Sequence, residues 1–169
     1  MSIRATGKLD FRTHKALQKA HMGAAYYIGI AMIGLSIAEF CFELLSRGAA
    51  EGFKSAWLFL AAAAYMVLLV FGIPRLTYRQ LGRLKDSVSE YEFGDEGITA
   101  SMSKDGIKQQ AEISYDMIEK VIETREFFFI YQTKNTAFYV DKKTLEGGTE
   151  EDIRAIFEPR LGKKYITRK

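Results

Sequence analysis

One long stretch without charge constrains this chain more than any other feature of its sequence. The 20 residues from position 55 to position 74, SAWLFLAAAAYMVLLVFGIP, contain no charged side chain. A helix of that length, rising ~1.5 Å per residue, spans the ~30 Å hydrocarbon core of a lipid bilayer. The sequence therefore predicts a transmembrane helix at residues 55–74.

A second apolar run, residues 22–45, precedes it and carries only two charges, Glu39 and Glu43. We predict a first transmembrane helix there, joined to the second by a short loop at residues 46–54. The alternative is a cleaved signal peptide, with Gly48-Ala49-Ala50 as a small-residue cleavage site. Mostly polar residues at positions 1–21 argue against that alternative, because a signal peptide places its apolar core near the N-terminus.

Basic residues beside the two apolar runs indicate the orientation. Five Lys or Arg side chains lie in the N-terminal juxtamembrane segment 1–21 and four in the juxtamembrane helix expected at 75–87, against Arg47 and Lys54 in the loop. By the positive-inside rule, both termini then lie in the cytoplasm and residues 46–54 lie outside it. Thr13 is the expected N-cap of a helix in the first segment.

Two basic groups are candidate contacts for anionic lipid headgroups. Arg75, Arg79 and Arg83 recur every four residues and share one helix face, while Lys163 and Lys164 lie in the basic tail 161–169. The alternatives are that the arginines only mark topology and that the tail is solvated.

Glu39 and Glu43 form a candidate polar site within the membrane, because residues four apart share a helix face. An ion-handling role competes with a placement at the membrane interface, where Arg47 can pair with a carboxylate. Small residues at positions 25, 29, 34 and 38 predict close packing inside the hairpin or, alternatively, a dimerisation face.

Short strands with turn signals follow from residue 88. The pattern predicts strands at 87–93, 98–103, 107–113, 121–124, 126–133 and 136–141, with a hairpin turn at Asp105-Gly106 and a helix capped by Thr149. The run EFFFIYQT is apolar on both faces, which predicts a strand that is covered twice. We therefore expect an α+β membrane protein: a two-helix transmembrane hairpin followed by a small antiparallel β sandwich or barrel at 88–160, pleckstrin-homology-like in order and closed by a C-terminal helix.

Residues 86–159 hold 17 acidic and eight basic side chains, a balance of −9. This charge argues against nucleic acid and phosphoinositides as ligands and favours a partner protein with a basic surface, added along a strand edge. A homo-oligomer is the other expected assembly.

Catalysis is not expected. Both histidines, His14 and His21, precede the membrane segments, Cys41 is the single cysteine, and no catalytic or nucleotide-binding motif occurs. The acidic turn at residues 94–97 with Asp105 is a weak alternative as a divalent-metal site. We expect no metal, no cofactor and no small-molecule substrate.

The stretch from Asp95 to Leu145 resembles a known family at several steps: Glu96-Gly97-Ile98, Ile113-x-Tyr115-Asp116-x-Ile118, residues 121–124 and the aromatic strand 127–131. In these features it is similar to the YcxB-like C-terminal domain of bacterial membrane proteins. The resemblance implies a bacterial cytoplasmic membrane location and no assigned activity. We therefore expect a membrane-anchored, non-catalytic cytoplasmic interaction module. The alternative is a subunit of a transport or stress-sensing assembly that uses Glu39 and Glu43.

Overall fold

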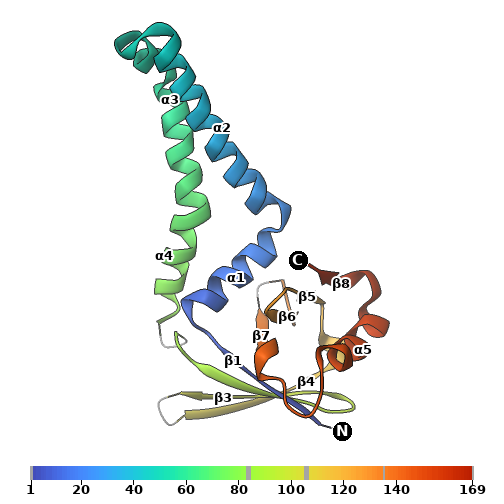
Figure 1. The fold of residues 1–169 in the computed structure, drawn as a ribbon. Coiled ribbons are helices and arrows are strands. Elements are labelled where there is room, and N and C mark those ends of the chain that lie inside the picture. Colours follow the sequence, from blue (N-terminus) through green and yellow to red (C-terminus); the bar gives the residue numbers. More distant parts are fainter. Residues whose placement is uncertain (1, 83–84, 105–106, 135, 169) are drawn as a thin grey trace. The chain divides into compact units, whose positions relative to one another are not determined.

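The chain folds into two compact units (Figure 1). A computed structural model describes residues 2–82, 85–104, 107–134 and 136–168. Residues 21–80 form one unit, which we call the hairpin. Residues 1–20 and 81–169 form the other, which we call the domain.

The hairpin consists of long helices in sequence: α2 (Ala24–Arg47), α3 (Ala49–Val67), a π-helical turn η1 (Leu68–Gly72) and α4 (Ile73–Gln80). By length and composition, residues 24–47 and 49–80 could each cross a membrane. The expected loop at 46–54 is wrong, because helix continues on both sides of Gly48, whose φ of 80° reverses the chain. A positive φ of this kind suits glycine, which has no Cβ.

Small residues bring the two helices of the hairpin together. Gly29, Gly52, Ala56 and Ala63 are buried, and the Cβ position of Gly29 faces Val70. Gly34, by contrast, is exposed with no atom near its Cβ position. The predicted packing inside the hairpin is thus confirmed for Gly29 and wrong for Gly34, and Ala25 and Ala38 are also exposed.

The first sheet of the domain has the antiparallel order β1-β2-β3-β4, with strands β1 (Ile3–Lys8), β2 (Val88–Phe93), β3 (Gly97–Lys104) and β4 (Ile107–Ser114). Three of these strands are as expected, but β1 lies in residues 1–21, which the sequence analysis assigned to a juxtamembrane segment. Ile3 and Ala5 point into the core, and their ladder partners Phe93 and Tyr91 follow the hairpin. The Asp105-Gly106 turn lies outside the described residues.

The second sheet has the order β7-β6-β5-β8, with β5 (Lys120–Glu123), β6 (Phe127–Tyr131), β7 (Ala137–Asp141) and β8 (Tyr165–Thr167). Short 3-10 turns η3 (Tyr115–Met117), η4 (Lys142–Thr144) and η5 (Gly162–Lys164) connect elements of the domain. Strand β8 pairs in parallel with β5. Part of the expected solvated tail 161–169 is therefore ordered sheet.

Two apolar clusters hold the domain together. The first lies between the inner faces of both sheets and the C-terminal helix α5 (Glu150–Leu161), which contributes Ile153 and Phe157. The second lies on the other face of the second sheet, where helix α1 (Phe11–Met22) contributes Ala16, Leu17 and Ala20. Both faces of β6 are therefore covered, as its apolar sequence predicts.

One of the two predicted helix N-caps is found in the structure. Thr149 caps α5 in a reciprocal box with Asp152, which confirms that prediction, although Pro159 lies within the helix. The predicted cap at Thr13 is wrong. Asp10 takes that role, since its carboxylate accepts a hydrogen bond from the Thr13 backbone N–H at 2.8 Å, and Thr13 itself is buried.

The expected barrel is also wrong, because both sheets stay open. The free edge of β1 is occupied by the segment after η4 instead of by β7. Backbone hydrogen bonds of 2.9 and 2.8 Å join Arg4 to Glu146, and Thr144 Oγ1 bonds to both the N–H and the C=O of Thr6. The edge backbone groups of Arg4 and Thr6 are therefore already satisfied and do not bond to β7.

Candidate functional site

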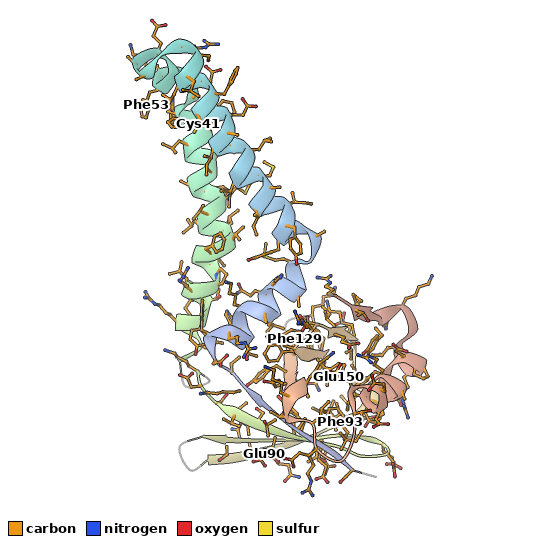
Figure 2. All side chains as sticks on the ribbon, viewed as in Figure 1. Cys41, Phe53, Glu90, Phe93, Phe129 and Glu150 are labelled. Carbon is orange, nitrogen blue, oxygen red and sulfur yellow. The ribbon has the colours of Figure 1, made fainter. Side chains whose placement is uncertain are left out.

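The outward face of the first sheet carries polar side chains in register across its strands. Side chains alternate between faces along a strand, so Glu90 points outward from β2 whereas Phe93 points into the core (Figure 2). Two rows of paired positions make up this surface, which we call the polar face: Arg4, Glu92, Thr99 and Glu112, and then Thr6, Glu90, Ser101 and Gln110.

A groove of about 680 Å³ lies over the polar face on β1, β2 and β3. Its wall is the segment at 143–146, which the hydrogen bonds of Thr144 and Glu146 hold against β1. Arg4 and Glu92 form an ion pair of 3.4 Å on its floor, and both side chains are largely exposed. Mixed charge and hydroxyl groups of this kind suit polar recognition of a partner chain.

Strand β4 presents the long open edge of the first sheet. It pairs with β3 on one side only, in an uninterrupted register from Lys104↔Ile107 to Gly97↔Ser114. At residues 109–114 its side chains are exposed except for Ile113, which points into the core. An open edge of this length offers backbone hydrogen bonds to an added strand.

Buried charges are concentrated around Glu123 at the end of β5. Its carboxylate accepts hydrogen bonds from Lys142 Nζ at 2.6 Å, from Arg154 Nη2 at 2.6 Å and from the Tyr165 hydroxyl at 2.7 Å. Glu150 joins through Lys142 at 2.7 Å, and Lys142 Nζ also lies 4.6 Å from the centre of the Phe128 ring. Glu123 and Lys142 side chains are only 3% and 6% exposed.

This network sets the ionisation of its members. Burial alone would raise the pKa of Glu123, but hydrogen bonds from Arg154, Lys142 and Tyr165 outweigh it and lower that pKa to about 2. Burial and the hydrogen bond to the Glu123 carboxylate raise the pKa of Tyr165. The network joins β5, η4, α5 and β8, and every donor faces a carboxylate, so its arrangement is that of a structural clamp.

A basic surface lies where α1 meets β8, on the second sheet. Arg12, Lys15 and Lys19 are exposed on α1, and Lys163 and Lys164 are exposed in η5. Ile166 of β8 packs against the same apolar cluster as Ala16 and Leu17 of α1, and the Arg168 guanidinium donates a hydrogen bond to the backbone oxygen of Ala20. We call these five exposed residues the basic surface.

The structure places the remaining predicted residues as follows. Arg75 and Arg79 are exposed on α4, and the Arg75 guanidinium donates to the Phe71 carbonyl at 3.3 Å. Arg83 lies outside the described residues. Lys163 and Lys164 lie in η5, directly before β8, instead of in a solvated tail.

Glu39 and Glu43 differ in their surroundings. Glu43 forms an ion pair of 2.8 Å with Arg47 and accepts a hydrogen bond of 2.9 Å from the Ser55 hydroxyl across the hairpin. Glu39 is exposed one turn earlier in α2. The ion pair of Glu43 with Arg47 is the one that the interfacial placement predicts, and an ion-handling role of either residue stays a prediction.

One histidine, His14, belongs to the domain although it precedes the hairpin in the sequence. His14 lies in α1 and is 8% exposed, its Nε2 is 3.1 Å from Gln18 Nε2, and burial lowers its pKa. Among the described residues, no three His, Cys, Asp or Glu side chains are grouped to hold a metal ion.

Fold and surfaces define a class: an α+β domain of two open sheets, interrupted in sequence by an apolar helical hairpin. It has a polar face on the first sheet and exposed basic side chains on α1, beside the second sheet. Within it, residues 93–157 match the family of YcxB-like proteins, so the chain carries a YcxB-like domain there. No curated protein and no solved structure matches the chain. The pleckstrin-homology-like character of the domain therefore stays a prediction.

Sequence reasoning missed β1, β8 and the Glu123 network. One local signal for β1 was present, since Ile3, Ala5 and Gly7 alternate with polar residues over the six residues of the strand. Nothing local marks Glu123 as buried, because its partners Lys142, Arg154 and Tyr165 are 19, 31 and 42 positions away.

Proposed function

We propose that this chain is a membrane-anchored, non-catalytic interaction module of the bacterial inner membrane, with the domain and both termini in the cytoplasm. In this proposal the hairpin crosses the bilayer twice and the domain binds a protein partner. Six meandering strands followed by a helix support a pleckstrin-homology-like arrangement, to which β1 and β8 are additions.

Pairing of β1 with β2 is the observation that carries the proposal. β1 precedes the hairpin and β2 follows it, yet the two form one ladder. Both segments must therefore lie on the same side of any membrane that the hairpin crosses, which requires an even number of crossings. Two candidate spans meet this requirement. Cleavage after Ala50, as in a signal peptide, would instead remove β1 and α1 from the domain.

Charge supports the cytoplasmic side. The segments that flank the hairpin are rich in Lys and Arg, which cytoplasmic loops favour. We propose that Arg75 and Arg79, together with the basic surface, contact anionic headgroups of the inner leaflet. The polar face, with its carboxylates, would be repelled by such lipid and remain available to a partner.

Fusions to reporter enzymes test the anchor and its orientation. Alkaline phosphatase inserted after Gly48 should be active, and a fluorescent protein fused after Lys169 should fluoresce. Membranes washed with alkaline carbonate should retain both fusions, whereas a variant that lacks residues 21–80 should be released. An inactive phosphatase after Gly48 together with a dark fluorescent protein after Lys169 would reverse the orientation, and release of the full chain by carbonate would remove the membrane anchor from the proposal.

A further inference from the structure

We propose that the open edge of β4 binds an extended, basic segment of a partner protein, which adds to the first sheet as a further strand. This inference rests on the proposed function in treating the domain as a binding module. It names the place on the domain and the chemistry of the partner.

β4 differs from the other sheet edges in being both long and unoccupied among the described residues. The edge of β1 is occupied by Thr144 and Glu146, and β7 runs close to β1, where Gly7 lies against the Tyr139 carbonyl. β8 is only three residues long. β4 is an eight-residue edge strand without proline, and its one lysine, Lys108, is its second residue, so residues 109–114 lack both of the usual protections of an edge.

One end of the β4 edge is acidic. Glu112 and Asp116 are exposed at the end of β4 and just after it. The turn before β3 brings Asp95 and Glu96 to the same end, since the Tyr115 N–H donates to the Glu96 carbonyl at 3.4 Å. Arg160, which lies 4.9 Å from the centre of the Tyr115 ring, is the neighbouring cation on α5. Four exposed carboxylates beside one arginine favour a cationic partner.

The same charges weigh against a second copy that pairs across its own Glu112. In the antiparallel register that places the two Glu112 residues opposite each other, residue 110 of each chain lies opposite residue 114 of the other, and the two carboxylates are direct neighbours. Like charges in such positions destabilise a sheet. A second copy in another register is one of the outcomes of the test below. A strand with lysine or arginine at alternate positions would hydrogen-bond to β4 through its backbone. Its cations would then lie on the polar face, beside Glu112.

Peptide binding to the full chain in phosphatidylcholine nanodiscs tests this inference, because neutral lipid does not attract the probe. The probe is a peptide of about ten alternating lysine and threonine residues. Controls are a glutamate–threonine peptide and the lysine–threonine peptide N-methylated at alternate amides. Fluorescence anisotropy reports affinity, and hydrogen–deuterium exchange reports which backbone amides become protected.

We expect the lysine–threonine peptide to protect the amides of residues 109–114 and neither control to do so. Glu112→Lys should weaken binding about fivefold or more. Glu126→Lys makes the same charge change on the second sheet, at the turn between β5 and β6, and should change affinity by less than about twofold.

Three results would overturn the inference: protection elsewhere or none, equal binding of the N-methylated peptide, or protection of β4 without peptide in nanodiscs that hold two chains. The last would assign the edge to a second copy. None of these results bears on the reporter fusions, so failure here and failure of the membrane anchor are distinguishable.

Discussion

Lys8 pairs with Val88 in the antiparallel ladder of β1 and β2, although the entire hairpin lies between them in the chain. The domain is thus assembled from two segments separated in sequence by residues 21–80. Ala20 and Leu81, which flank the hairpin, both pack in the apolar cluster under α1. Both ends of the hairpin therefore start from the same apolar cluster of the domain.

Replacement of residues 21–80 by a flexible linker of about six residues should yield a soluble, folded domain, since such a chain reaches ~12–15 Å. Residues 81–169 alone should not fold, because they lack β1 and α1 and leave two apolar clusters uncovered. Burial of a large apolar side chain stabilises by about 1.5–3 kcal/mol, and a domain is stable by only about 5–15 kcal/mol in total. Circular dichroism and the dispersion of NMR signals compare the linked domain with fragment 81–169. Equal stability of the two proteins would contradict the pairing of β1 with β2.

Glu123→Gln should lower the free energy of unfolding at pH 7 by about 3 kcal/mol, because it leaves buried cations without their carboxylate. The pKa of Glu123 is lowered from 4.5 to about 2 in the folded state. Its contribution is therefore present above pH 4.5 and is lost as the pH falls toward 2. This is tested by urea unfolding, from pH 7 to pH 2, of the domain in which a linker replaces residues 21–80. The free energy of unfolding should depend less on pH in the Glu123→Gln variant than in the unsubstituted domain.

Glu126→Gln serves as the control for that change. Glu126 pairs with Arg12 at 2.6 Å, but both side chains are largely exposed. We expect little effect on stability or its pH dependence, since exposed ion pairs are weak. If both variants behaved alike, the clamp around Glu123 would not be a stabilising feature.

Two tyrosines of the domain should respond in opposite ways to loss of the hydroxyl. The Tyr139 hydroxyl is buried and, within the described part of the chain, has no hydrogen-bond partner. Tyr139→Phe should therefore be neutral or stabilise by up to about 1 kcal/mol, whereas Tyr165→Phe, which removes the bond to Glu123, should destabilise by about 1–3 kcal/mol. Thermal unfolding of both variants checks the contrast, and a destabilised Tyr139→Phe would reveal an unseen partner.

Gly7→Ala should destabilise the domain by about 3 kcal/mol or prevent its folding, because a Cβ there overlaps the Tyr139 carbonyl oxygen. Gly94→Ala is the matched control, since its Cβ would meet only the Gly97 carbonyl at 3.6 Å, an ordinary contact. We expect Gly94→Ala to change stability by less than about 0.5 kcal/mol. Equal effects of the two substitutions in urea unfolding would argue against close approach of β1 and β7.

Local patterns were sufficient for much of the fold. Strands β2 to β4 follow from alternation of apolar residues, and β5 to β7 follow from short apolar runs between turn signals. The capping box of Thr149 and Asp152 predicts the start of α5 within four residues. The helices of the hairpin could be predicted from their apolar composition alone. These features could be predicted because every interaction that defines them lies within a few residues along the chain.

Partners distant in sequence decided the rest. β1 is a strand only because β2 lies beside it, and β8 only because β5 does. Burial of His14 and Glu123 follows from elements that no local pattern links to them. The sequence by itself thus determined the elements and their charge segregation. Tertiary structure alone decided which edges are closed, which carboxylate is buried and which strand remains open, since these depend on contacts that form only when distant segments meet.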